Sequence, residues 1–244
     1  MNKIKSFLYL AAICLVGLAS CEKEFVKIPT ENTNFDGKAN VRLANFVVNS
    51  NRNYVFVDNV LVSGTSSAYT STYPNAPSFM TMNAGSRAIL IKDTLATTTQ
   101  VPINVSANLE AGSYYTIFTY DSIINAKSKL VKDVIVTPTD TTARLRFAHF
   151  AYSTAAIPNV DVYSTRRAQN IFTNVSLTSV TDFIPYASAI SDTLYVRETG
   201  KTVNLAGINA FSAITKRSYT VIFRGSYRLT TGTAARTLSS FLTY

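Results

Sequence analysis

The sequence has 244 residues, of which only 15% are charged, and a formal net charge of +9. Its basic residues are scattered, with Arg166 next to Arg167 and Lys216 next to Arg217 as the adjacent pairs. Nucleic-acid binders concentrate such residues on one face or helix, so we expect no nucleic-acid partner. The abundance of Thr, Ser, Tyr and Val favours half-buried strands over amphipathic helices.

Residues 1–20 predict a bacterial lipoprotein signal peptide. Lys3 and Lys5 precede an apolar run over residues 7–18, which is too short for a stable membrane-spanning helix. The run ends in Leu-Ala-Ser-Cys at residues 18–21, which resembles the bacterial lipobox at its expected distance from the start. The resemblance implies lipid attachment to the Cys21 sulfur and cleavage before it. The alternative is an ordinary secretory peptide with an incidental cysteine.

Residues 21–38 predict a lipidated, flexible tether. The stretch Glu22-Lys23-Glu24 resembles the surface-export signal of lipoproteins from the Bacteroidetes phylum, and a plain polar tether is the alternative. Two or three acyl chains would anchor the protein to the membrane. We therefore expect a surface-exposed outer-membrane lipoprotein of the cell envelope. With Cys14 cleaved off and Cys21 lipidated, no thiol remains for a disulfide or a metal site.

Residues 39–137 predict a first β-sandwich. Apolar and polar residues alternate in short segments, with Val41 and Leu43 on one strand face and Arg42 on the other. Clusters of Asn, Gly, Ser, Thr and Pro separate the segments, which is typical of immunoglobulin-like sandwiches. The further expected strands are 54–57, 60–63, 78–82, 88–92, 101–107, 114–120 and 130–136.

A local signature near residue 115 supports this fold. Residues 109–115 have the form Leu-x-Ala-Gly-x-x-Tyr, which resembles the tyrosine corner of Greek-key sandwiches. In such a corner the Tyr115 hydroxyl bonds to backbone a few residues upstream. The second half of the chain keeps the tyrosine as Tyr219 but lacks the Leu and Gly, so we expect a degraded corner there.

Residues 143–244 predict a second sandwich after a linker with the composition of a turn, Thr-Pro-Thr-Asp-Thr-Thr at residues 137–142. Tyr219, Val221 and Phe223 would share one strand face. The expected strands are 144–150, 160–164, 177–184, 193–197, 203–205, 219–224 and 237–244.

The two halves are related by an internal repeat. Residues 39–46 and 143–150 share Ala, Arg, Ala and Phe at identical spacing, a shift of 104. Segments 55–57, 89–92 and 115–118 recur with a shift of 104 or 105. A repeat of this length predicts one structural unit used twice.

The repeated segments also resemble the DUF4397 family. The resemblance rests on Ala-Arg-Leu-Arg-Phe-Ala-His-Phe at 143–150, Pro-Asn-Val-Asp-Val-Tyr at 158–163 and Leu-x-Ala-Gly-x-x-Tyr-Thr at 109–116. It implies a secreted or lipid-anchored bacterial protein with tandem copies and no established activity. The first copy departs from the pattern, with Asn45 in place of His149 and Phe56 in place of Asp161, so the two copies could not share a role for that His or Asp.

The sequence offers little catalytic chemistry. His149 is the only histidine, so it cannot form a histidine-based metal site, and we expect no metal and no cofactor. A triad of Ser153, His149 and Asp161 lacks any recognisable nucleophile context. We expect His149 to be a structural residue bonded to Asp161 or to backbone, and the protein not to be an enzyme.

Glycan binding is the strongest specific alternative. The chain has no Trp, and most of its 14 Tyr and 14 Phe fall at alternating strand positions that predict core. Tyr69, Tyr73 and Tyr152 lie in expected loops and are the candidate ligand contacts.

Four short stretches resemble the Asp-Ser/Thr-aliphatic/Thr site of O-glycosylation in Bacteroidetes. The acceptors would be Thr94, Ser122, Thr141 and Thr193.

Together these features predict an all-β protein: two tandem immunoglobulin-like β-sandwich domains after a lipoprotein signal peptide and a flexible tether. The function expected is a non-enzymatic binding or scaffolding module of the envelope, with a glycan or an envelope protein as partner. The alternatives are a glycan-binding accessory of a nutrient-uptake system and, last, a hydrolase.

Overall fold

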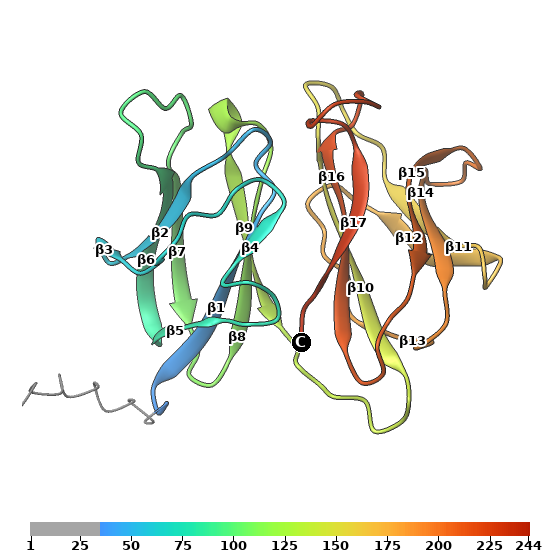
Figure 1. Ribbon diagram of the computed structural model, residues 1–244, viewed down its shortest axis with the longest axis horizontal. Helices are drawn as coiled ribbons and strands as arrows, with labels where there is room; N and C mark the ends of the chain where they lie inside the picture. Colours follow the sequence, from blue (N-terminus) through green and yellow to red (C-terminus); the bar gives the residue numbers. More distant parts are fainter. Residues whose placement is uncertain (1–34) are drawn as a thin grey trace, which may run out of the picture. The chain divides into compact units, whose positions relative to one another are not determined.

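The computed structural model describes residues 35–244 and confirms the all-β class (Figure 1). Its one short helical turn is η1 (Ile123–Asn125). No helix in this part of the chain is long and apolar enough to cross a membrane. The signal peptide, Cys21 and most of the tether lie outside the described residues.

The first sandwich consists of two sheets. In one sheet the order is β4-β1-β8-β9, with β5 also paired to β1, and in the other it is β3-β2-β6-β7. The strands are β1 (Lys38–Asn45), β2 (Asn53–Val57), β3 (Val60–Leu61), β4 (Ser71–Tyr73), β5 (Met80–Asn83), β6 (Gly85–Asp93), β7 (Ile103–Leu109), β8 (Tyr114–Tyr120) and β9 (Lys127–Asp133).

The second sandwich repeats this plan. Its sheets have the orders β13-β10-β16-β17 and β12-β11-β14-β15. The strands are β10 (Ala143–Tyr152), β11 (Val160–Ser164), β12 (Gln169–Val175), β13 (Ile184–Tyr186), β14 (Asp192–Glu198), β15 (Asn204–Phe211), β16 (Ser218–Ser226) and β17 (Thr237–Leu242).

Each sandwich encloses its own core, built from the alternating positions that the sequence predicts. Val41 and Leu43 are fully buried in the first core, and Val221 and Phe223 in the second, with Tyr219 packed against it. On β7 only every second residue is buried, as expected for a strand with one solvent-facing side.

The strands β1 and β10 differ, because both of their faces are buried. Residues 41–45 on β1 and 145–151 on β10 are buried without a break. Each strand lies at the centre of its sheet and pairs in parallel with β8 or β16. The outward face of these sheets is therefore covered, and residues Asp36–Tyr244 form a single compact unit that contains both sandwiches.

Two segments of the second sandwich differ from the predicted strands. Residues 169–175 form the edge strand β12, which alternation did not reveal because its pairing with β11 is interrupted by register shifts. The segment 177–184, expected to be a strand, instead turns at Thr178, whose φ is +63°. Only its last residue, Ile184, enters β13.

Candidate functional site

The outward faces of the two central sheets pack against each other, and we call this contact the seam. Its apolar part holds Ala44, Phe46 and Phe118 from the first sandwich and Ala148, Phe150 and Ile222 from the second, all buried. The Phe118 and Phe150 rings stack with centroids 5.0 Å apart. The seam therefore resembles a protein interior, which favours a fixed arrangement of its residues.

Three of the four residues that recur identically in the repeat are seam residues, whereas Ala39 and Ala143 lie in the two cores. Arg42 and Ala44 on β1, and Phe46 directly after it, correspond to Arg146, Ala148 and Phe150 on β10, and all six are buried. They lie on the strand face opposite Val41 and Leu43. Alternation placed Arg42 on that face correctly, and the structure adds that the face is closed.

Arg146 reaches across the seam to the first sandwich. Its Nη1 lies 2.7 Å from Asp133 Oδ1, and both side chains are at most 3% exposed. Its Nε donates to Thr220 Oγ1 at 2.8 Å, while Thr116 Oγ1 donates to Asp133 Oδ2 at 2.6 Å. The Arg146 Nη2 atom is buried and has no partner among the described residues.

Arg42 reaches across the seam in the opposite direction. Its Nη2 donates to the carbonyl of Thr243 at 2.8 Å and its Nη1 to that of Leu242 at 3.2 Å. Burial lowers the pKa of Arg42 to about 10, with Asp133 opposing the shift and Arg146 adding to it. Arg42 is thus still protonated at neutral pH. Two buried cations, Arg42 and Arg146, face a single buried carboxylate, Asp133.

Two phenylalanines complete this symmetry. The guanidinium carbon of Arg42 lies 4.0 Å from the Phe79 ring centroid, and that of Arg146 lies 4.7 Å from Phe183. Phe79 and Phe183 are again 104 residues apart, so the repeat extends beyond the segments evident from sequence. Each guanidinium carbon thus lies over an aromatic ring, within the range of a cation–π interaction.

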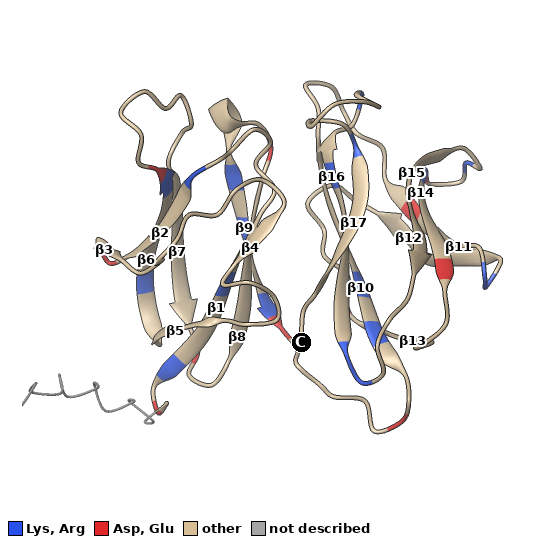
Figure 2. Ribbon diagram, in the orientation of Figure 1, with Lys and Arg blue, Asp and Glu red and all other residues tan. Residues whose placement is uncertain are grey.

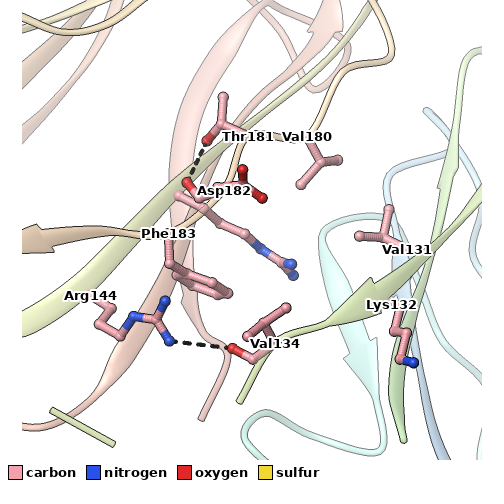
Figure 3. Close-up of a pocket in the computed structure, with 9 residues that line it drawn as sticks. Val131, Lys132, Val134, Arg144, Val180, Thr181, Asp182 and Phe183 are labelled. Carbon is pink, nitrogen blue, oxygen red and sulfur yellow. Dashed lines mark hydrogen bonds between the residues drawn. The ribbon is translucent and has the colours of Figure 1, made fainter. Parts of the chain in front are cut away.

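A cleft of about 230 Å³ is lined in part by Arg146. Figure 3 shows the cleft with eight of its other lining residues labelled. Val131, Val134, Val180 and Phe183 form its apolar wall. Its charged groups are the buried Arg146, the half-buried Arg144, and the exposed Lys132 and Asp182. Arg144 stacks on Phe183 at 5.0 Å, and Lys132 is paired with Glu110 at 2.5 Å.

An equivalent hollow of about 350 Å³ lies beside Phe79 and is lined by residues of both sandwiches. Asn40 and Phe79 in this hollow are equivalent in the repeat to Arg144 and Phe183 in the cleft beside Arg146. Its cation is Arg217. The two hollows thus share a framework but differ in charge, and the one beside Arg146 is richer in cations. Elsewhere Lys and Arg are spread over both sandwiches (Figure 2).

The residues weighed as a triad are not brought together. His149 is fully buried, its ring lies 5.5 Å from that of Phe223 in a tilted arrangement, and its Nδ1 lies 3.2 Å from the Val175 carbonyl. Asp161 instead accepts hydrogen bonds from Asn170, Asn174, Thr199 and Gly200. Ser153 caps its own loop through the amide of Ala155. Burial lowers the pKa of His149 to about 4, so it is neutral at physiological pH.

The tyrosines of the predicted corners make the upstream backbone bonds of that motif. Tyr115 OH accepts from the amide of Glu110 at 3.0 Å, and Tyr219 OH accepts from that of Ile214 at 3.2 Å. In the turn between Glu110 and Tyr115, Gly112 adopts a φ of +73°. In the turn between Ile214 and Tyr219, Lys216 adopts a φ of +62°.

The three candidate ligand tyrosines are all half-buried, and two of them lie in strands and not in the expected loops: Tyr73 ends β4 and Tyr152 ends β10. Tyr69 lies at the seam, where its hydroxyl accepts from Arg224 Nη1 at 2.9 Å. Tyr73 OH accepts from the amide of Gly64 at 2.8 Å. Burial raises the pKa of the Tyr152 hydroxyl. None of the three lines the cleft beside Arg146.

The four candidate glycosylation residues differ in accessibility. Thr94 follows β6 and Thr141 lies in the linker, and both are exposed. Ser122 at the start of η1 and Thr193 on β14 are half-buried.

The cleft residues Arg144, Val180 and Phe183, and the seam residue Asp133, were not singled out from the sequence. A usable signal was present for one of them, because the shift of 104 that relates Arg42 to Arg146 also relates Phe79 to Phe183. Among residues 35–244, no three His, Cys, Asp or Glu side chains form a group that could hold a metal ion.

Fold and cleft define an all-β protein of two sandwiches joined by a buried seam. The family model described as "Domain of unknown function (DUF4397)" matches residues 39–163, and the chain belongs to this family. The match spans the first sandwich together with β10 and β11 of the second.

No curated protein matches the sequence. One similar solved structure is CBMbc, a family CBM26 module from Eubacterium rectale Amy13K in complex with maltoheptaose. It is 11% identical, the match covers 85% of this chain and 97% of that one, and the TM-score is 0.25. That score is too low for its ligand to bear on this chain.

Proposed function

We propose that this protein is a non-enzymatic binding or scaffolding module of the bacterial cell envelope, carried by a lipid on Cys21. One observation carries the binding role: the seam holds open a cleft that is lined in part by the buried Arg146, whose Nη2 has no hydrogen-bond partner among the described residues. Rigid elements that position polar groups in an apolar hollow are the usual basis of a binding site.

The chemistry of His149 supports the non-enzymatic part of the proposal. The only imidazole of the chain is fully buried between aromatic rings and cannot meet a substrate. Ser153 and Asp161, the other two residues of the candidate triad, form hydrogen bonds with other residues and not with His149. A general base needs access to the proton that it removes.

Anchoring is tested in native-host cells with wild type and Cys21→Ser. We expect the wild type to fractionate with membranes and to be cleaved by protease added to intact cells, whereas the variant is soluble. Equal membrane association of both would contradict the lipid anchor. Full protection of a lipidated wild type would place the protein on the periplasmic face.

Binding is tested by a photo-crosslinking amino acid at Val134, which lines the cleft and is 58% exposed. The control position is Val203, which is 70% exposed in the loop before β15. Intact-mass analysis after irradiation of native-host cells should find adducts at position 134 and not at 203. No adduct at 134, or equal adducts at both positions, would overturn the proposal.

A further inference from the structure

The polar groups in the cleft indicate which ligand it would take. Arg146 is 2% exposed and uses Nη1 and Nε for Asp133 and Thr220, which leaves Nη2 without a partner. A buried cationic donor without an acceptor is costly, and native structures rarely leave one empty. The missing partner is an acceptor, and the excess of buried positive charge at the seam favours an anionic one.

The geometry points to a small monovalent carboxylate with a compact apolar body. The carboxylate would accept from Arg146 Nη2 and from the guanidinium of Arg144, which reaches the same cleft. Charge-assisted bonds of this type are the strong ones in protein recognition. This inference deepens the proposed binding function and rests on it.

The other lining residues restrict the ligand further. Asp182 places a negative charge on the wall, which disfavours dianions such as phosphate. Val131, Val134 and Val180 offer apolar surface and no hydrogen bonds from their side chains to sugar hydroxyls. The Phe183 ring is stacked by Arg144 and Arg146, which disfavours its use as a sugar platform.

The ligand must also be small. A volume of about 230 Å³ is below the range of drug-sized sites, so it admits a short acid or one terminal residue of a chain. A free acid and a peptide C-terminus share this chemistry, and the two sources are separated by the probes used.

The experiment is an NMR titration of the purified full-length protein with sodium valerate, a free acid, and with N-acetylvaline, a mimic of a chain terminus. Saturable shifts at Val180 and Phe183 amides by either probe, up to about 50 mM, are expected, and the tighter probe identifies the source. Methyl valerate and phosphate should bind at least about tenfold more weakly. Absence of saturable binding by both carboxylates, or equal binding of the ester or phosphate, would overturn the inference. Tighter binding of sodium glucuronate would overturn the apolar part.

The variants assign the site. Arg144→Asn, which introduces the residue found at the equivalent position 40, should weaken binding about tenfold. Arg217→Asn, in the hollow beside Phe79, should leave it unchanged. Arg146→Lys should abolish binding, and if that variant does not fold, the pair Arg144→Asn and Arg217→Asn decides. Equal affinities of these two variants would place the site elsewhere. If the wild type does not bind either carboxylate but a probe at position 134 still forms adducts, this inference alone is refuted. If the wild type shows neither carboxylate binding nor adducts at position 134, the binding function is refuted as well.

Discussion

Arg146 on β10 and Asp133 on β9 form a buried ion pair across the seam, with 2.7 Å between Nη1 and Oδ1. The pair joins the last strand of the first sandwich to the first strand of the second. Asp133 is the one carboxylate that faces both Arg146 and Arg42, so the charge balance of the seam depends on it.

Asp133→Asn should therefore destabilise the protein by about 3 kcal/mol, because it leaves two buried guanidinium groups without a counter-charge. Urea unfolding of wild type and variant measures the loss. The matched control is Asp58→Asn, which removes the carboxylate of the surface pair Arg87–Asp58, 45% exposed at the aspartate. A loss in the seam variant no larger than in the control would show that the ion pair does not hold the seam together.

Stability should decrease on mild acidification because of His149. Burial lowers the pKa of its imidazole from 6.5 to about 4, so below pH 6.5 the unfolded chain binds a proton that the folded chain excludes. The free energy of unfolding should fall by about 2 kcal/mol between pH 7 and 5, and stop falling from this source below about pH 4. The pKa values of Asp58, Asp140 and Asp192 are lowered from 3.8. The stabilising contribution of these carboxylates is therefore lost only below the range from pH 7 to 5.

Denaturant unfolding of His149→Asn tests the assignment, since Asn occupies the equivalent position 45. Its stability should vary little between pH 7 and 5. If the free energy of unfolding of the variant still falls with decreasing pH as steeply as that of the wild type, the pH dependence belongs to another group.

Gly225→Ala should be severely destabilising. Gly225 lies on β16 with φ +85°, and an added Cβ would lie 2.2 Å from the carbonyl oxygen of Ala235, a backbone atom that cannot move aside cheaply. We expect a loss of at least about 3 kcal/mol in thermal or urea unfolding. Gly112→Ala is the control, because φ is +73° there but nothing lies within 4 Å of the added atom. Its cost should be about 1 kcal/mol, from backbone strain alone; equal losses would refute the steric explanation.

Tyr115→Phe should cost about 1 kcal/mol by removing the hydroxyl that accepts from the Glu110 amide. Tyr219→Phe removes the equivalent bond to Ile214, which is longer and lies at a half-buried ring. We expect a smaller loss at 219 than at 115 in urea unfolding. A larger loss at 219 would mean that the corner in the second sandwich is not the weaker one.

The sequence was sufficient to predict the two cores but not the seam between them. Val41 and Leu43 were placed on the buried face by simple alternation, since a strand with one apolar face shows a period of two. The opposite face of β1 carries Arg42, which in sequence resembles a solvent-facing residue. Only its contacts with Leu242 and Thr243, 200 and 201 residues away in the chain, show that this arginine is buried.

The cleft was unpredictable for the same reason. Arg144 comes from β10, Val180 and Phe183 come from the connection between β12 and β13, and Val131 comes from the first sandwich. Their proximity depends on how two sheets pack, which no local pattern encodes. The tyrosine corner, by contrast, joins residues five positions apart, so its hydrogen bond could be inferred from a short motif.

Scanning calorimetry of the full-length protein tests most directly whether the seam makes the two sandwiches one rigid unit that positions the cleft. A buried ion pair and stacked phenylalanines across the seam predict a single transition, with equal calorimetric and van't Hoff enthalpies. Two separate transitions in the wild type would show that the sandwiches unfold independently, and would contradict a rigid cleft.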